Sequence, residues 1–172
     1  PAGGAGGEGG DGAAGMAGAF TAAANDASAL FYNPAGLARL DAHELEVSFN
    51  TGMGETSLQN LAYARPTPFT GLTGNGRTSA AAGLLYSRSG LIEINRLNAD
   101  GSLGSSQSIS AGSDLVLSGA YAERVAITPL ELRGGTYALD HYFGATGKYV
   151  RSTVVTYTAS SLAADMGYLL LS

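Results

Sequence analysis

From position 44 onward, large apolar residues alternate with polar or small residues along the chain. In the segment 45–50 the apolar positions are Leu45, Val47 and Phe49, and the residues between them are polar. A period of two is typical of a half-buried strand. The pattern therefore predicts an all-β, antiparallel fold of about six long strands. The expected strands are 45–50, 57–65, 78–95, 106–124, 141–151 and 162–171.

Proline and glycine set the expected strand ends. Pro66 should end the second strand, because proline cannot donate to a sheet ladder, and 71–76 should be a loop. The Asn98 to Gly101 segment contains Asp-Gly, the strongest short hairpin signal. The outer part of that hairpin, 93–110, is polar, which predicts that it projects into water. Residues 125–135 are expected to form a connection that includes at most a short strand.

The segment before the strands has a different pattern. Residues 19–30 are rich in alanine, a strong helix former, and predict one or two helical turns. The sequence Asn33-Pro34-Ala35-Gly36 predicts a tight turn that stops this helix. Residues 1–15 are rich in glycine and show no period, so they are either a mobile arm or a segment threaded into a lumen. We expect two regions: 1–42, an arm and plug, and 43–172, the strands.

Composition excludes several classes of protein. The 172 residues include 26 glycines, 45% apolar residues and only 13% charged residues, with no long apolar run. This argues against a disordered chain and against a helical membrane span. A net charge of −5 without a basic patch argues against nucleic-acid binding.

Candidate chemistry is sparse. The chain has no cysteine and two histidines, His43 and His141, so we expect neither a metal nor another cofactor. No serine lies in a Gly-x-Ser-x-Gly setting, and we expect no enzymatic activity. The chain shows no signal peptide, which distinguishes neither an exported from a cytoplasmic protein nor a whole chain from a part.

The strand lengths are close to the roughly 9–11 residues that cross a membrane in a β-barrel. Tyrosines recur near the expected strand ends, where a ring can lie at the depth of the lipid headgroups and form an aromatic girdle. Tyrosine is also common in the strands of soluble sandwiches. The pattern itself leaves both interpretations open. The tyrosines of this girdle are Tyr63, Tyr86, Tyr121, Tyr149 and Tyr168.

Three charged residues fall on the strand face opposite the large apolar residues: Glu46, Lys148 and Asp165. A hairpin that turns near Thr156 would bring Lys148 and Asp165 across from each other. We expect them to pair inside a barrel, with an effect on strand register rather than on transport. Six strands are fewer than the eight of the smallest single-chain barrels. The sheet would then be part of a larger barrel, or would be completed by another chain.

The segment GMAGAFTAAANDASALFYNPAGLARLDAHELEVSF, residues 15–49, resembles the plug and first strand of the FadL-type outer-membrane β-barrels. It is most similar to the branch that includes PorV and PorQ. Weaker similarity continues through LAYARP, SAAAGLLYSRSGLIEI, DLVLSGAYAERV, GATGKYV and YTASSLAADMGYLL. The resemblance covers most of the chain from position 15 to 171 and about the first half of such a family member.

The resemblance implies an antiparallel transmembrane β-barrel in the bacterial outer membrane, with a short plug in its lumen. In the PorV/PorQ branch it implies a surface attachment or accessory subunit in protein secretion, or a structural subunit of a larger envelope assembly. Partners would then be membrane lipid and other proteins, held through extracellular loops such as 93–110. The alternative is a FadL-like channel for hydrophobic small molecules, in which Asn33 to Gly36 would act as a hinge in the plug.

Overall fold

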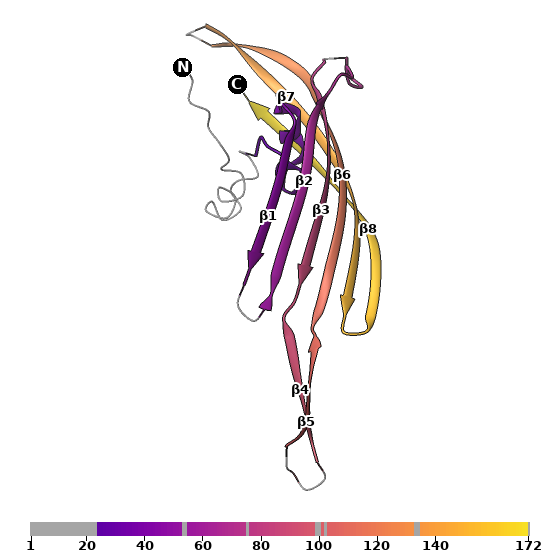
Figure 1. The fold of residues 1–172 in the computed structure, drawn as a ribbon. Helices are drawn as coiled ribbons and strands as arrows, with labels where there is room; N and C mark the ends of the chain where they lie inside the picture. Colours follow the sequence, from indigo (N-terminus) through magenta and orange to yellow (C-terminus); the bar gives the residue numbers. More distant parts are fainter. Residues whose placement is uncertain are drawn as a thin grey trace.

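The computed structural model of the protein describes residues 24–52, 55–74, 76–98, 101, 103–132 and 135–171. Six strands form one antiparallel sheet in the order β1-β2-β3-β6-β7-β8, and β4 and β5 form a separate ribbon (Figure 1). This confirms the all-β, antiparallel fold. The described strands form an open sheet. Their bounds are β1 Glu44–Thr51, β2 Ser57–Thr67, β3 Thr78–Arg88, β4 Leu91–Leu97, β5 Leu103–Ser110, β6 Gly112–Leu132, β7 Gly135–Val154 and β8 Tyr157–Leu171.

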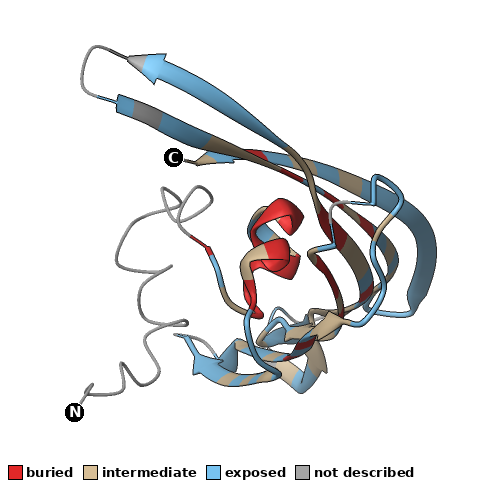
Figure 2. Ribbon diagram, turned by 90° about the horizontal axis from the view of Figure 1, so that it is seen from above, coloured by how far each residue is buried: buried red, intermediate tan, exposed pale blue. Residues whose placement is uncertain are grey.

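The sheet curves around two short helical segments, α2 (Ala29–Tyr32) and the 3-10 helix η2 (Pro34–Arg39), which lie in its hollow (Figure 2). We call residues 24–40 the plug. The end of the sheet where β1 begins is the plug end, and the end from which β4 and β5 project is the ribbon end. The buried core lies between the plug and the concave face of the sheet. Its apolar members are Ala24, Ala27, Ala29, Leu30, Ala35, Leu37, Ala38, Leu40, Ala62, Ala64, Ala81, Ala122, Tyr142 and Leu169.

The two longest predicted strands are each broken in two. β3 ends at Arg88 and β4 begins at Leu91, and Ala111 separates β5 from β6. Hydrogen bonds bridge the break, from the Ser89 N–H to the Gly112 carbonyl (2.9 Å) and from the Ala111 N–H to the Gly90 carbonyl (3.0 Å). Glycine adds a backbone bend here at little cost. The prediction of a hairpin that projects from the sheet holds, but the hairpin is a ribbon of its own.

Two predicted strand ends are wrong. β2 continues through Pro66 to Thr67, and the expected connection 125–135 is the tip of a long hairpin in which Pro129 pairs with Ala138. At each proline, the strand is paired with a neighbouring strand on one side only. β1 pairs with β2 only as far as Ala64, and β3 pairs with β6 only as far as Glu123. A free edge tolerates the missing N–H.

Among its described residues, the predicted helical segment 19–30 is helical only at its end, from position 29. Its first described turn begins at Ala29, and residues 19–23 lie outside the described residues, as does the arm 1–15. Pro34 does not simply end the helix, because it is the first residue of η2. Proline suits that position, since its fixed φ favours the helix and the first N–H has no partner in any case. In the described part of the chain, no helix is both long and apolar enough to cross a membrane.

Candidate functional site

The plug lies against a part of the sheet with almost no side chains. Gly144 of β7 faces Pro34, and Gly167 of β8 faces the side-chain oxygen of Asn33. A Cβ at either glycine would overlap those atoms. A Cβ at Gly83 of β3 would lie 2.5 Å from the Leu30 Cδ2. Glycine therefore lets the wall and the plug approach to backbone contact.

The predicted turn at Asn33 orders the plug itself. Asn33 has an extended backbone, and its side-chain oxygen accepts a hydrogen bond from the Ala35 N–H at 3.2 Å. Its own N–H donates to the Ala29 carbonyl at 3.0 Å. Pro34, Ala35 and Gly36 follow as the first turn of η2 and are buried. The four predicted turn residues thus link α2 to η2 and form the part of the plug nearest the wall.

Two polar contacts tie the ends of the plug to the sheet. The Glu44 carboxylate at the start of β1 accepts a hydrogen bond from the Ala27 N–H at 2.8 Å. The Arg77 guanidinium, just before β3, donates to the Arg39 carbonyl at 3.2 Å and pairs with Asp41. The sequence pattern did not single out Glu44 or Arg77. Both lie next to strand starts, and this was the only signal that could have marked them.

The three predicted lumen residues lie on the concave face. The Glu46 carboxylate accepts a hydrogen bond from the Asn60 amide at 3.1 Å. Lys148 and Asp165 form an ion pair with side chains 20% and 46% exposed. They are diagonal neighbours rather than directly opposite, because Thr146 pairs with Asp165 and Lys148 with Ala163. The pairing was predicted correctly, and the exact register was not.

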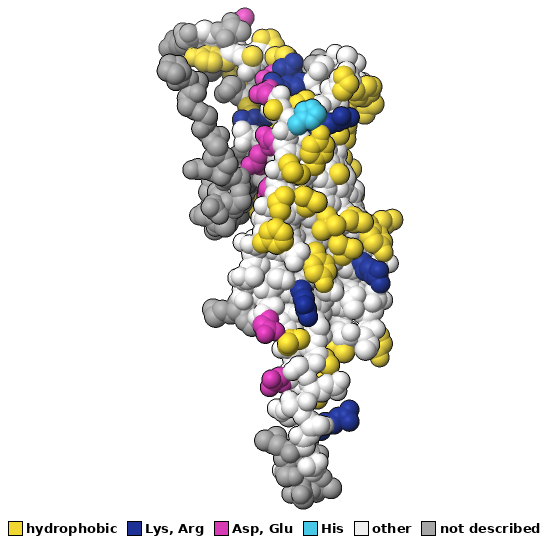
Figure 3. Space-filling model, in the orientation of Figure 1, with side chains coloured by type: hydrophobic (Ala, Val, Ile, Leu, Met, Phe, Trp, Pro, Cys, Tyr) yellow, Lys and Arg dark blue, Asp and Glu magenta, His cyan; other side chains and the backbone are white. Residues whose placement is uncertain are grey.

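On the convex face, large apolar residues of neighbouring strands lie directly beside one another. Residues that pair directly across the sheet point to the same face and form rows that cross the strands. One row is large and apolar in all six strands, and the next row toward the plug end is small over β3, β6, β7 and β8. Figure 3 shows hydrophobic side chains gathered over the middle of the strands. The large row is Val47, Leu61, Leu84, Leu117, Tyr149 and Leu162, and the small positions are Ala82, Gly119, Gly147 and Ala164.

A polar row bounds the convex face at the ribbon end. Every residue in it is a serine, a threonine or an arginine. In β2, β7 and β8 the apolar surface already ends one row earlier, at Gln59, Arg151 and Ser160. Phe49 and Met166, which lie inside the apolar surface, are 73% and 79% exposed. Large apolar residues exposed to this extent make the convex face a candidate contact surface. The polar row is Thr51, Ser57, Arg88, Ser113, Thr153 and Thr158.

The five predicted girdle tyrosines all lie on the convex face, in two lines. Tyr63, Tyr121 and Tyr168 form a line nearer the plug end, and Tyr86 and Tyr149 form a line nearer the ribbon end. In both lines the position moves by two residues toward the plug end for every two strands crossed. The two lines are therefore parallel and oblique to the rows.

The hydroxyl groups of the plug-end line are all hydrogen-bonded. Tyr63 bonds to His43 Nδ1 at 2.7 Å, Tyr168 bonds to His141 Nδ1 at 2.6 Å, and Tyr121 donates to Glu123 at 2.5 Å. The two histidine pairs have the same ring-centroid separation, 6.1 Å. The sequence pattern left both histidines without a role. Their tyrosine partners lie 20 and 27 residues away and become neighbours only through the strand register.

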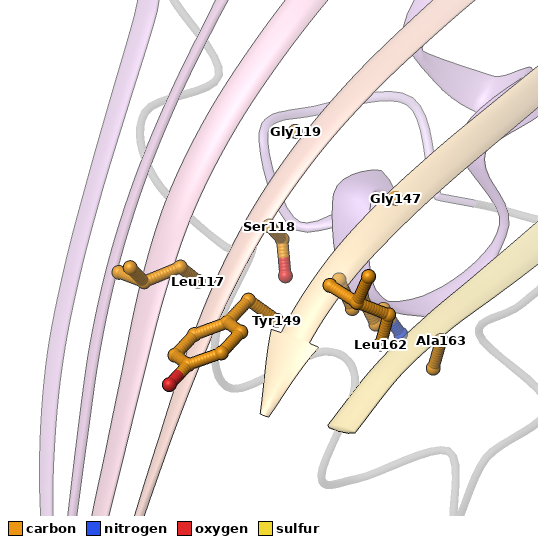
Figure 4. A pocket seen from close by; sticks show the side chains of 8 residues that line it. Leu117, Ser118, Gly119, Gly147, Tyr149, Leu162 and Ala163 are labelled. Atoms are coloured by element: carbon orange, nitrogen blue, oxygen red, sulfur yellow. The ribbon is translucent and has the colours of Figure 1, made fainter. Parts of the chain in front are cut away.

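A shallow groove crosses the convex face where Gly119 and Gly147 leave no side chain. Its volume is about 440 Å³. Figure 4 shows Leu117 and Tyr149 on one side of it and Leu162 on the other. An open apolar groove of this kind suits an aliphatic chain rather than a polar substrate.

The ribbon of β4 and β5 has two unlike faces. Ile92 pairs with Ile109, and Ile94 pairs with Gln107, so three isoleucines share one face. The side chains of Ile92 and Ile94 are 47% and 43% exposed. The other face carries Leu91, Glu93 and Asn95, which pair with Ser110, Ser108 and Ser106 in β5. A two-stranded ribbon is marginally stable in water alone, so this apolar face is a candidate contact surface.

Among the described residues, no group of three or more histidine, aspartate or glutamate side chains is placed to hold a metal ion. The features that the described residues present are an apolar convex face, a polar and plugged concave face, and a projecting ribbon.

Comparison with known proteins places this plugged antiparallel sheet in a family. Residues 7–111 match the Uncharacterised protein family (UPF0164). The match covers more than half of the chain and includes the plug and β1 to β5, so the protein belongs to that family. Neither the curated proteins nor the solved structures gave a match.

Proposed function

We propose that this chain forms the plugged wall of a bacterial outer-membrane β-barrel, which serves as a surface attachment or accessory subunit of PorV/PorQ-like type in protein secretion or a larger envelope assembly. The carrying observation is the contrast between the two faces of one sheet. The convex face has a row of large apolar residues across all six strands, and the concave face holds the plug and an ion pair. Transmembrane barrels alternate in this way, with apolar side chains toward lipid.

The oblique lines of tyrosines support a membrane orientation. A shift of one residue, about 3.4 Å, for each strand spacing of about 4.8 Å corresponds to a slope of about 35°. Strands in transmembrane barrels tilt by about 35–45° from the barrel axis. If the strands tilt in this way, each line of tyrosines lies at a constant depth. That is the arrangement of an aromatic girdle.

The ribbon supports a role in attachment. It projects beyond the end of the sheet opposite the plug (Figure 1). The side chains of Ile92 and Ile94 on it are exposed. A partner that covers these isoleucines would remove apolar surface from water and stabilise a ribbon that is marginal alone.

The test combines barrel formation with partner capture. The protein is extracted from outer membranes, and we expect heat-modifiable migration on a gel together with a copurifying protein. The double change Ile92→Ser and Ile94→Ser should abolish copurification and leave the heat shift intact. The matched control is Glu93→Ser with Asn95→Ser on the opposite face, which should keep the partner. Absence of the heat shift from the unchanged protein would refute the barrel, and a partner retained by the isoleucine variant would refute attachment through the ribbon.

A FadL-like channel for hydrophobic small molecules is the second candidate, and the seat of the plug favours it. Gly144 and Gly167 have no side chains, so the plug lies there against the backbone of the wall and no side chain at these two positions hinders its displacement. Gly144→Ala should then raise single-channel conductance in planar bilayers. Gly147→Ala, on the open convex face, is the control. Equal conductance of the two variants would argue against a gating plug.

A further inference from the structure

The sequence Tyr-X-Arg occurs three times, at Tyr63 to Arg65, Tyr86 to Arg88 and Tyr149 to Arg151. Each copy lies in a different strand: β2, β3 and β7. Residues two apart in a strand project from the same face, so each arginine lies beside its tyrosine on the convex face.

The direction of the strands gives every copy the same orientation. β2 runs toward the plug end, whereas β3 and β7 run toward the ribbon end. In each strand the arginine follows the tyrosine, so it lies farther from the middle of the apolar face. Arg65 therefore marks the plug-end border, and Arg88 and Arg151 mark the ribbon-end border.

The charge of the convex face is opposite to that of the whole chain. The formal charge of the protein is −5, yet the exposed charged residues on the convex face of the described six-stranded sheet are Arg65, Arg88 and Arg151. Arg65 forms no ion pair with any described residue. The convex face is thus a surface that attracts anions at its two borders.

β6 shows what happens where a carboxylate takes the place of the arginine. Glu123 follows Tyr121 by two residues and is only 3% exposed. The loop after β2 covers it, and the Leu72 N–H donates to its carboxylate at 2.8 Å. The Glu123 carboxylate is therefore enclosed by protein, whereas the three arginines that follow a tyrosine by two residues are exposed.

The distance between the two borders has the size of a membrane. At the slope of the tyrosine lines, the Arg65 level and the Arg88 level are separated by about nine residues along a strand, which is about 25 Å along an axis tilted by about 35°. The apolar band of outer-membrane barrels is about 25 Å tall.

We propose that the three Tyr-X-Arg pairs bind the phosphate groups of lipid headgroups, Arg65 in one leaflet and Arg88 and Arg151 in the other. This rests on the proposed membrane location and adds the lipid partner. The guanidinium group presents several donors in a fork that matches phosphate oxygens. The neighbouring tyrosine keeps its ring in hydrocarbon and its hydroxyl in the headgroup layer.

The test measures the preference of the whole protein for anionic lipid. It is reconstituted in phosphatidylcholine vesicles, and the association of spin-labelled phosphatidylglycerol is compared with that of spin-labelled phosphatidylcholine. An arginine near an anionic surface strengthens association about five-fold. Each of Arg65→Gln, Arg88→Gln and Arg151→Gln should remove one phosphatidylglycerol site of about that preference, and the triple variant should remove most of it. A variant with lysine at all three positions should retain a large part of the preference for phosphatidylglycerol, because lysine also binds phosphate.

Arg96→Gln is the matched control, since Arg96 is exposed on the ribbon and has no tyrosine two residues before it. An equal loss of lipid preference in this variant would reduce the effect to net charge and overturn the proposal. Inorganic phosphate, compared with chloride at equal ionic strength, should leave the preference unchanged. If it abolished the preference, the pairs would be general anion sites rather than lipid sites.

Failure of this proposal is distinguishable from failure of the membrane location. The same samples are labelled with a fluorophore at Leu84→Cys, in the apolar row, and brominated lipid is added. Quenching together with an unchanged lipid preference of the triple glutamine variant would refute only the headgroup sites. Absence of quenching would refute the membrane location itself.

Discussion

The two faces of the six-stranded sheet are built from the same strands but differ in almost every physical property. The concave face has small side chains, three tight glycines and a buried core against the plug. The convex face has large apolar side chains that are mostly exposed. In a soluble sandwich one face of a sheet packs on a core and the other is polar. Here the face that packs on the plug has the smaller and more polar side chains of the two. This is the inverse of the sandwich pattern, and it is the pattern expected of a barrel wall in lipid.

The difference also separates two uses of glycine. Gly144 and Gly167 face the plug and have no room for a Cβ. A Cβ at Gly119 or Gly147 would meet no atom within 4 Å, and these two glycines open a groove on the convex face. Glycine on the concave face is required because the plug lies in contact with the backbone. On the convex face it shapes a surface.

The largest expected effect comes from placing a charge on the convex face. Phe49→Arg should destabilise the folded protein in lipid by about 2–4 kcal/mol, because arginine near the middle of a bilayer is poorly solvated. Urea titration of the heat-modifiable form in vesicles measures this. Asn50→Arg is the matched control, since Asn50 is the next residue, exposed on the concave face. Equal losses at both positions would remove the distinction between the faces.

A methyl group on the concave face should have the next largest effect. Gly144→Ala pushes a Cβ into the backbone of Pro34 and should destabilise the plugged state by about 1–3 kcal/mol, the usual cost of overpacking. Limited proteolysis of the plug reports the change. Gly147→Ala should leave the protease pattern unchanged. A plug equally protected in both variants would contradict the close seat.

The hydroxyl groups of the tyrosine lines should matter less. Tyr63→Phe removes the bond to His43 and should cost about 0.5–1.5 kcal/mol in the same urea titration. Tyr149→Phe is the control, because its hydroxyl has no hydrogen-bond partner among the described residues. If the two changes cost the same, the histidine contact does not stabilise the border.

The smallest expected effect is that of the concave ion pair. In a double-mutant cycle with Lys148→Met and Asp165→Asn, the coupling energy should be below about 1 kcal/mol, because the Asp165 side chain is 46% exposed. A coupling energy above about 3 kcal/mol would instead indicate a buried, water-free interior.

The period of two predicted correctly which face of the sheet each strand residue takes, because this depends only on local geometry. Leu45, Val47 and Phe49 do lie on one face, opposite Glu46. The tyrosines were identified as a set, but their two lines needed the pairing register, which no single segment contains. The long hairpin around Pro129 was predicted as a connection because proline was given too much weight at a free edge.

The candidate site was predicted only in part. Asn33 to Gly36 stood out through turn chemistry, and Lys148 and Asp165 stood out as charges in strands with few charged residues. The glycines that seat the plug could not be distinguished from the other glycines of a chain that has 26. Their role depends on which face meets the plug, and that is a property of the tertiary structure.

The most direct test of the central claim, that the convex face meets lipid and the concave face does not, uses neighbouring residues in the same strand. The chain has no cysteine, so one cysteine can be introduced at a time, at Val47 or Ser48 in β1 and at Leu162 or Ala163 in β8, and labelled with a fluorophore. In vesicles of brominated lipid, we predict strong quenching at positions 47 and 162 and weak quenching at positions 48 and 163. Equal quenching within each pair, or stronger quenching at 48 and 163, would contradict the account.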